Sequence, residues 1–242
     1  FKSWFIDFDP VRAKAEGRST GLSKEISDLF PDSFEDSELG EIPKGWKADS
    51  LEGIINRSKD KVGDIESKVL SAVNSGELVL SEEYFSKRVF SKDTKKYLKV
   101  QKYDFAYNPS RINIGSIGMS KKDYIGAVSP IYIVFKPKQS WQWFLEQFIR
   151  LKSTNSKIIQ LSSGSVRQSL SYEDFASIPL TLPEINILEE FNKIFCSLRE
   201  KIIHNENECG VLRSLRDTLL PKLISGELRI PDAENLVEEA GI

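Results

Sequence analysis

The sequence has few of the residues that enzymes most often use for catalysis or metal binding. Its 242 residues include two cysteines and one histidine. Cys196, His204 and Cys209 all fall within one predicted helix, where they do not supply the tetrahedral ligand spacing of a zinc site. Along such a helix the two cysteines lie about 20 Å apart, too far for a disulfide. Unpaired cysteines are typical of a reducing compartment, so we expect a cytoplasmic protein.

Glycine-rich phosphate-binding motifs and long apolar runs are also missing. Neither G-x-x-x-x-G-K-[ST] nor G-x-G-x-x-G occurs, so nucleotide or cofactor binding lacks its usual sequence support. No apolar stretch approaches the length of about 18 residues that a membrane span requires. With 29% charged and 10% aromatic residues, the composition is typical of a soluble globular chain of one to two domains.

One charged pattern leaves a metal-dependent nuclease open as an alternative. Glu66 and Lys68 match the E-x-K half of a nuclease motif, with Asp49, Asp60 or Asp64 upstream. Patterns of three residues occur by chance in most chains of this length. The surrounding sequence also fits a solvated helix with charge pairs four residues apart, such as Asp64 and Lys68.

A second enzymatic pattern is incomplete. The sequence Asn108-Pro109-Ser110-Arg111 is similar to the N-P-P-aromatic motif of adenine methyltransferases. It lacks both the second proline and the aromatic residue that stacks on a flipped base. We therefore predict a turn at these residues.

The charges are distributed unevenly along the chain. Residues 1–50 carry 7 basic and 11 acidic side chains, a balance of −4. Residues 51–182 carry 20 and 13, a balance of +7, and residues 183–242 carry 7 and 12, a balance of −5. A basic middle segment between acidic ends indicates a domain that meets a polyanion while its neighbours meet protein.

The basic segment 51–182 has the short apolar runs and turns of a mixed domain. One helix is predicted after Ser140, with an apolar face between Trp141 and Ile149, and a shorter one after Ser171, where Asp174 completes a capping box. Five runs, most of them rich in β-branched or aromatic residues, are candidate strands. They are Leu78–Leu80, Arg88–Phe90, Ile112–Ile114, Ile131–Phe135 and Ile158–Leu161.

The segment from Pro183 to Leu223 is predicted to form one long helix. Its length is about 55 Å at about 1.5 Å per residue, and Pro221 is expected to kink or end it near Leu220. Apolar residues occupy eight of ten positions at a spacing of 3.5 residues, which is typical of a coiled-coil seam. An amphipathic helix folded back on its own domain is the alternative. The ten positions are Phe191, Phe195, Leu198, Ile202, Asn205, Cys209, Leu212, Arg216, Leu219 and Leu223.

The first 50 residues read as the end of one helix and a connector. Aromatic residues in segment 1–14 have helical spacing before Pro10, which is expected to end that helix. The connector, residues 16–47, is rich in acidic residues, glycine and proline. Within it, Ser23 is expected to cap a short helical turn that Pro31 closes.

Residues 84–122 hold ten lysines and arginines against Asp93 and Asp104, and aromatic residues alternate with them. Lysines can contact DNA phosphates, while asparagine, glutamine and arginine can contact base edges. The alternative is that the aromatic residues form a core and the lysines are solvated. The candidate DNA-binding residues, including two from a later loop, are Lys92, Lys95, Lys96, Lys99, Asn108, Arg111, Ser116, Lys121, Lys122, Arg167 and Gln168.

Five short segments occur in an order that is informative as a set: 39–46 (LGEIPKGW), 105–108 (FAYN), 115–118 (GSIG), 128–132 (VSPIY) and 178–183 (IPLTLP). This order resembles the target recognition domain of specificity subunits of type I restriction-modification systems. The segment 215–228 (LRDTLLPKLISGEL) resembles the end of the distal conserved helix of that family, and residues 1–18 resemble the end of its central conserved helix.

The resemblance implies that DNA recognition and catalysis belong to different subunits. Subunits of that family usually contain two recognition domains separated by two antiparallel long helices, and each domain reads half of a split DNA target. This chain resembles only the second half, so we expect a fragment or a half-size subunit. Catalysis would belong to partner methyltransferase and restriction subunits, which use S-adenosylmethionine, ATP and Mg²⁺. The chain itself would then need no cofactor and no metal.

These observations predict an α+β protein: a mixed recognition domain with several short strands, followed by one long coiled-coil-type helix. The expected division is 1–18 for the tail of the central helix, 19–50 for the connector, 51–182 for the recognition domain, 183–225 for the spacer helix and 226–242 for the tail. We expect a non-catalytic, sequence-specific DNA-binding subunit, with a nuclease or a coiled-coil adaptor without DNA contact as alternatives.

The expected partners are double-stranded DNA, methyltransferase subunits and a restriction subunit, with no membrane. The seam of the long helix is expected to bind a partner helix, either from another subunit or from a second copy of this chain. The seam positions assigned to that contact are Phe191, Phe195, Leu198, Ile202, Cys209, Leu212 and Leu219.

Overall fold

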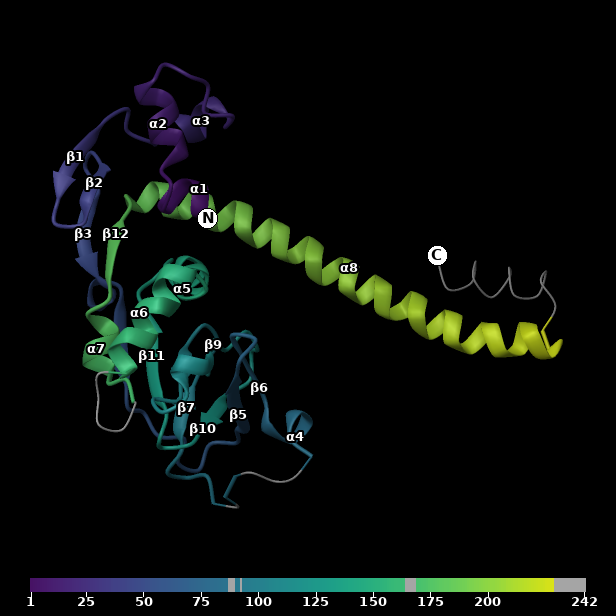
Figure 1. Cartoon of the computed structure of the whole chain (residues 1–242). Helices are drawn as coiled ribbons and strands as arrows, with labels where there is room; N and C mark the ends of the chain where they lie inside the picture. Colours follow the sequence, from purple (N-terminus) through teal and green to yellow (C-terminus); the bar gives the residue numbers. More distant parts are fainter. Residues whose placement is uncertain (87–89, 92, 164–168, 229–242) are drawn as a thin grey trace. The chain divides into compact units, whose positions relative to one another are not determined.

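The protein is described by a computed structural model that covers residues 1–86, 90–91, 93–163 and 169–228. The chain divides into two compact units, Phe1–Asn192 and Lys193–Ile242. The first unit contains all the strands of the described residues, and the second begins inside the long helix (Figure 1).

An eight-stranded mixed sheet forms the centre of the first unit. Its strand order is β4-β11-β8-β9-β6-β5-β10-β7, with β5 parallel to β10, β6 parallel to β9 and all other neighbours antiparallel. The strands are β4 (Ile55–Ser58), β5 (Lys68–Val73), β6 (Glu77–Leu80), β7 (Leu98–Val100), β8 (Phe105–Tyr107), β9 (Ile117–Met119), β10 (Gly126–Val128) and β11 (Ile133–Pro137).

Aromatic packing joins this sheet to the helices that follow it. The rings of Phe105 and Phe135 stack with centroids 5.3 Å apart, and Phe175 lies 5.2 Å from Phe135. Tyr107, which is fully buried, donates its hydroxyl proton to the backbone oxygen of Ser171 at 3.0 Å. These contacts place helix α7 (Tyr172–Ala176) against β8 and β11. The other helices of the domain are α4 (Ser81–Tyr84), α5 (Gln142–Ile149) and α6 (Lys152–Ser163).

Several local predictions are confirmed. Residues 78–80 lie in β6, and most of the run 131–135 lies in β11. The Ser171 side chain accepts a hydrogen bond from the Asp174 backbone amide at 3.0 Å, as a capping box requires. Residues 109–111 form a turn, in which the Asn108 side chain accepts from the Ser110 amide.

Two predicted strands are helical instead. Ile112–Ile114 forms the 3₁₀ helix η2, closed by Gly115 in a left-handed conformation (φ 87°). The run 158–161 lies within α6, whose buried residues Thr154, Ile158 and Ser162 recur every four positions. Runs of three or four apolar residues are too short for either periodicity to be recognised. The candidate strand 88–90 lies partly outside the described residues.

The prediction of a solvated helix around Glu66 is also wrong, because this segment contains a strand. Residues 68–73 form β5, which pairs with β6 and β10. Asp64 pairs with Lys95 and not with Lys68. The charge spacing fits a helix locally, but strand pairing with distant segments satisfies the backbone here. Ser140 does not cap α5 either: it has φ 70°, and Trp141 occupies the cap position without a side-chain hydrogen bond.

The N-terminal part contains short helices and two small sheets. The helices are α1 (Lys2–Phe5), α2 (Asp9–Ala15) and α3 (Lys24–Ser27). Pro10 was predicted to end the first helix, but it lies at the start of α2, where a missing amide proton has no cost. The left-handed Phe8 (φ 55°) separates α1 from α2. Strands β1 (Phe34–Ser37) and β2 (Gly40–Pro43) form a hairpin, and β3 (Lys47–Ser50) pairs antiparallel with β12 (Pro179–Leu182).

The long helix is confirmed as α8 (Ile185–Ser225), with 41 residues. Its first turns are part of the first unit, where Ile187, Leu188 and Phe191 are buried. The prediction that the helix ends near Leu220 is wrong. Helix α8 continues past Pro221 for another turn, up to Gly226, which has φ 74°. Proline removes only one backbone hydrogen bond, and so close to a helix end few bonds depend on it.

Candidate nucleic-acid interface

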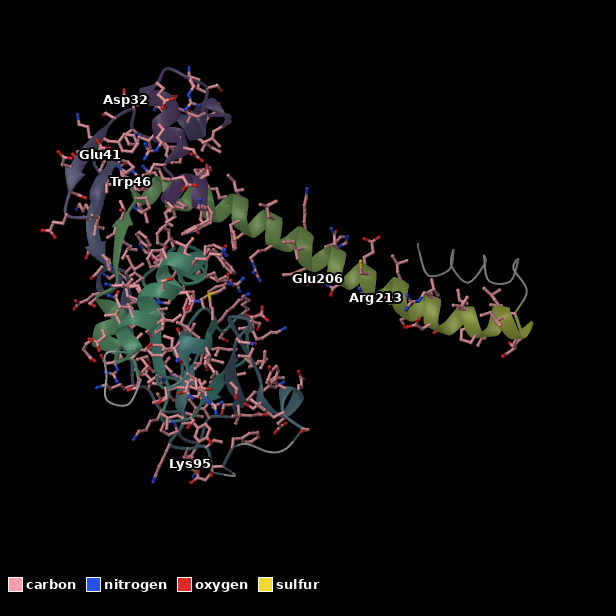
Figure 2. All side chains as sticks on the ribbon, viewed as in Figure 1. Asp32, Glu41, Trp46, Lys95, Glu206 and Arg213 are labelled. Carbon is pink, nitrogen blue, oxygen red and sulfur yellow. The ribbon has the colours of Figure 1, made fainter. Side chains whose placement is uncertain are left out.

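Three of the predicted phosphate-binding lysines lie at one edge of the main sheet. Lys99 is on β7, the last strand in the sheet order, and Lys95 and Lys96 lie in the loop before it. Lys95 is exposed and forms an ion pair with Asp64 (Figure 2). The Lys96 side chain is exposed and the Lys99 side chain is half-buried. Lys92 lies outside the described residues.

Other lysines near this edge have acidic partners. Lys102 donates to Asp123 at 2.6 Å, and this hydrogen bond raises the pKa of the lysine. Lys136 donates to Asp60 at 3.0 Å, which lowers the pKa of that carboxyl group. Exposed pairs of this kind contribute little to stability, so these lysines can exchange their partners at small cost.

A second group of predicted residues lies in the loop between β8 and β9. The Asn108 amide donates to the Ser116 carbonyl oxygen at 3.0 Å, and Arg111 is exposed. Ser116 is buried, and its hydroxyl donates to the Ala72 carbonyl oxygen at 3.0 Å. The Ser116 hydroxyl therefore ties this loop to β5. Arg167 and Gln168, predicted to join the group, lie outside the described residues.

The two remaining candidates follow β9 and have different environments. Lys122 is exposed. The Lys121 side chain is only 19% exposed, and its Nζ lies 2.8 Å from Glu146 and 3.3 Å from Glu77. Glu146 is 1% exposed and also binds the Arg150 guanidinium at 3.0 Å. Glu146 and Arg150 were not among the predicted site residues, although their spacing of four residues on a predicted helix is a signal for an ion pair.

The residues of the nuclease alternative are dispersed. Asp60 and Asp64 pair with lysines, and the Lys68 Nζ lies 4.8 Å from the ring centroid of Tyr124. Across residues 1–86, 90–91, 93–163 and 169–228, no three His, Cys, Asp or Glu side chains are grouped so that they could hold a metal ion. None of the helices in the same residues is long and apolar enough to cross a membrane.

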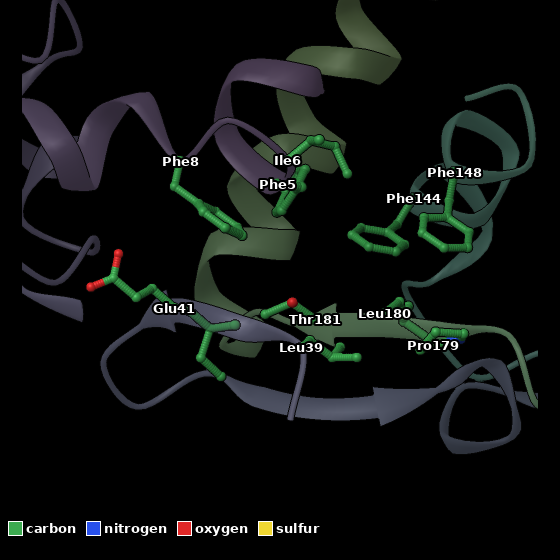
Figure 3. A pocket seen from close by; sticks show the side chains of 11 residues that line it. Phe5, Ile6, Phe8, Leu39, Glu41, Phe144, Phe148, Pro179, Leu180 and Thr181 are labelled. Atoms are coloured by element: carbon green, nitrogen blue, oxygen red, sulfur yellow. The ribbon is translucent and has the colours of Figure 1, made fainter. Parts of the chain in front are cut away.

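An apolar cavity of about 310 Å³ lies between the N-terminal segment, the β1–β2 hairpin, α5 and β12. Figure 3 shows the rings of Phe5, Phe8, Phe144 and Phe148 around it. Leu39, at 41% exposure, lines the same cavity from the hairpin. These side chains offer a ligand apolar packing, and the exposed carboxylate of Glu41 and the hydroxyl of Thr181 also line the cavity.

Beyond Asn192, α8 exposes most of its apolar seam. Leu198, Ile202 and Leu212 are 56%, 55% and 41% exposed, and Cys209 is exposed as well. Phe195 and Leu219 are half-buried, and Phe191 is buried. Charged side chains such as Glu206 and Arg213 project from the same helix (Figure 2). An exposed apolar stripe of this kind is typical of a helix that binds another helix.

A mixed sheet domain followed by a 41-residue helix confirms the predicted α+β fold class. No family model matches the chain. It is 26% identical over 235 residues to the type I restriction enzyme MjaIX specificity subunit of Methanocaldococcus jannaschii, covering 96% of this chain and 52% of that protein. It is 25% identical over 279 residues to the HindI specificity subunit of Haemophilus influenzae, covering 94% of this chain and 60% of that protein.

Two solved structures are also similar. They are the HsdS subunit from Thermoanaerobacter tengcongensis, at 11% identity and a TM-score of 0.41, and the type I S subunit from M. genitalium, at 14% identity and a TM-score of 0.46. Each alignment covers 90% of this chain and 53% of the other. As its sequence predicted, the chain is similar in sequence to type I restriction enzyme specificity subunits, and it spans 52–60% of the length of the curated relatives it matches.

Proposed function

We propose that this chain recognises one half of a bipartite DNA target, as a specificity subunit of a type I restriction-modification complex. The observation that carries the proposal is the basic segment 51–182, with a charge balance of +7, which folds around its own sheet and exposes cationic side chains on its loops. Homology to specificity subunits supports the same assignment. A surface of this charge attracts the phosphate backbone, and its loops provide side chains for base contacts.

The chain contributes recognition and no catalysis in this proposal. Methylation and cleavage belong to methyltransferase and restriction subunits, which bring S-adenosylmethionine, ATP and Mg²⁺. Purified alone, the chain is expected neither to methylate nor to cut DNA when these are added. Cleavage that Glu66→Ala or Lys68→Ala abolished would support the nuclease alternative instead.

Partner subunits are proposed to bind α8. Its exposed seam beyond Asn192 offers Leu198, Ile202 and Leu212 at the spacing that a partner helix requires. That partner is a methyltransferase or restriction subunit, or a second copy of this chain. We place the assembly in the cytoplasm, because the free cysteines Cys196 and Cys209 fit a reducing compartment.

A domain exchange tests the proposal. Replacing residues 51–182 with the corresponding segment of another specificity subunit should change which half-target is methylated and leave the spacing between half-targets unchanged. The matched control inserts seven residues near Asn205, together with an equal insertion in the partner helix. It lengthens the rod by about 10 Å, or roughly three base pairs, and should change only the spacing. If the exchange leaves the methylated sequence unchanged, the proposal fails.

Salt dependence distinguishes DNA recognition from the adaptor alternative. Lys95→Ala or Lys96→Ala should weaken binding to all DNA sequences alike. Each phosphate that the variant no longer neutralises should reduce the slope of log affinity against log salt by about 1. An adaptor without DNA contact would bind no duplex at any salt concentration, and its methyltransferase partner would keep its target specificity without this chain.

A further inference from the structure

Two loops of the recognition domain pack together because glycine occupies the points of contact. The β5–β6 turn is Asn74-Ser75-Gly76, and the second loop follows η2 at Gly115. A Cβ atom on Gly115 would lie 3.4 Å from the Asn74 Cα, and both Gly76 (φ 79°) and Gly115 (φ 87°) have left-handed backbones. On β9, a Cβ on Gly118 would lie 2.5 Å from the Glu77 carbonyl carbon, a distance that real structures do not allow. Side chains at these positions would separate the loops.

The guanidinium of Arg150 lies beside the contact between these two loops and is paired with the buried carboxylate of Glu146. Arg150 Nε is 3.6 Å from the point where a Gly76 side chain would begin. Arg150 Nη2 lies 3.0 Å from Glu146 Oε1, and Lys121 Nζ lies 2.8 Å from the same oxygen. Glu146 is 1% exposed, whereas Arg150 is 44% exposed. The buried end of the ion pair therefore fixes the orientation of a guanidinium that is still accessible from outside.

A pocket of about 240 Å³ opens next to this guanidinium. Its apolar lining is formed by Ile112, Ile117, Ile149 and Ile158, and its polar lining by Asn74, Ser75, Arg150 and Asn155. Asn74, Ser75 and Asn155 are exposed, and within the part of the chain that the structure describes their side chains make no hydrogen bond to another residue. Exposed amide and hydroxyl groups beside an apolar pocket are available to a ligand that displaces their water.

The charges around Arg150 favour a base as the ligand over a phosphate. The linked ionic groups are Glu77, Lys121, Glu146 and Arg150, and their formal charges cancel. Because this cluster has no net charge, it attracts a phosphate only weakly. The guanidinium N–H groups of Arg150 that do not bind Glu146 still point in a fixed direction and can donate to a ligand. In the major groove a directed guanidinium matches the O6 and N7 acceptors of guanine, and an asparagine amide matches N6 and N7 of adenine.

We infer that Arg150, positioned by Glu146, contacts the edge of a guanine in the DNA target, with Asn74 and Asn155 contacting the neighbouring base pair. The inference rests on the proposed function, and it assigns base contacts to residues that sequence reasoning did not select. Arg150 and the two asparagines are specificity-determining residues, whereas Glu146 acts through Arg150 and is a positioning residue.

Selection from random DNA duplexes tests the inference, with the full chain bound to its methyltransferase partner. Arg150→Ala should reduce the preference for guanine at one position by about tenfold or more and leave the salt slope unchanged. Arg150→Lys should behave in the same way, because an ammonium keeps the charge without the planar fork. The matched control is Arg57→Ala on the edge strand β4, which removes an arginine that is 35% exposed and paired with Glu173. It should leave all base preferences unchanged.

Glu146→Gln tests the positioning role separately. It should loosen the same guanine preference while Arg150 remains present, with cooperative thermal unfolding retained as the check on folding. A uniform loss of affinity with a smaller salt slope in Arg150→Ala would identify a phosphate contact and overturn the inference, as would unchanged base preference in Arg150→Lys. If the unmodified complex selects a sequence and the variants select the same one, only the inference fails. If the unmodified complex selects none, the proposed function fails with it.

Discussion

The heptad seam of α8 is buried in the first turns of the helix and mostly exposed in the rest. Up to Asn192 the seam belongs to a core: Phe191 is 6% exposed and its ring centroid lies 5.1 Å from that of Phe5. Seven residues later, Leu198 occupies the same seam position and is 56% exposed. One sequence pattern therefore serves domain packing in the first turns and remains available to a partner in the rest. Heptad spacing identifies the contact face of a helix but not what covers it.

The aromatic cluster explains why the first turns of α8 are covered. Phe1, Phe5, Phe144 and Phe191 come from three separate segments and their rings meet edge to face or tilted, with centroids between 5.1 and 5.8 Å. Aromatic pairs add to the free energy of burial beyond the area removed from water. The N-terminal segment, α5 and the start of α8 are thereby joined into one unit.

The largest expected effect is a difference in the free energy of unfolding between variants in the buried and the exposed part of the seam. Phe191→Ala should lower the free energy of unfolding by about 3–5 kcal/mol, because it leaves a cavity among buried rings. Leu198→Ala should change it by less than about 0.5 kcal/mol, since an exposed side chain loses little on truncation. Urea unfolding of the two variants measures the difference. An equal loss in both would mean that the seam beyond Asn192 is already covered in the purified chain.

A second effect concerns the end of the exposed part. Pro221 removes one hydrogen bond from α8, and a proline inside a helix is less favourable than alanine by about 3 kcal/mol. Pro221→Ala should therefore stabilise the last turns and slow amide hydrogen exchange between residues 217 and 225. Exchange at residues 187–191 should be unaffected and serves as the internal control. Faster exchange near the proline would contradict the helical continuation.

A third change tests whether the exposed seam binds protein. Leu198→Glu combined with Ile202→Glu should weaken self-association or partner binding by about tenfold or more, because two charges would enter an apolar contact. The matched control is Ile203→Glu with Val211→Glu, which changes two equally exposed apolar residues off the seam and should leave binding unchanged. Light scattering and partner capture at micromolar concentration measure both. Equal binding by the two double variants would show that the seam is not the contact.

The smallest expected effect uses a charge buried in the sheet domain. Asp104 is 6% exposed, and burial raises its pKa above the ordinary value of 3.8. The folded protein therefore holds this proton more tightly than the unfolded chain, and stability falls as the pH rises from about 3.8 through the raised pKa. Asp104→Asn should remove this part of the pH dependence. Urea unfolding at several pH values between 4 and 7 measures it, and an identical pH dependence in both proteins would contradict the assignment.

Much of the local structure follows from short-range patterns. The capping box at Ser171 and Asp174, the turn at Asn108 and the helix of 41 residues all depend on interactions within a few residues of the chain. The long helix continues past Pro221 because a proline so close to a helix end affects few backbone hydrogen bonds. The family resemblance is a property of segment order, and homology over nearly the whole chain confirms it.

The errors lie where a short pattern fits two structures. Residues 112–114 and 158–161 are apolar runs of three or four residues, and residues 59–77 have helical charge spacing but contain strands. In each case the outcome depends on pairing with distant parts of the chain, such as β5 with β10, which no local window contains. Among the candidate DNA-binding residues, Ser116 was chosen for its polarity, and the structure turns its hydroxyl inward to Ala72.

The amino-acid sequence alone determined the fold class, the basic charge of residues 51–182, the heptad seam and the family to which the chain is similar, because each depends on composition, local hydrogen bonding or segment order. Tertiary structure decided where the seam is buried and which charged groups meet. Glu77, Lys121, Glu146 and Arg150 lie up to 73 positions apart in the sequence, and only the closure of β6, β9 and α5 around one buried carboxylate brings them together. Burial makes that contact specific, since a carboxylate taken out of water requires its cations at close range.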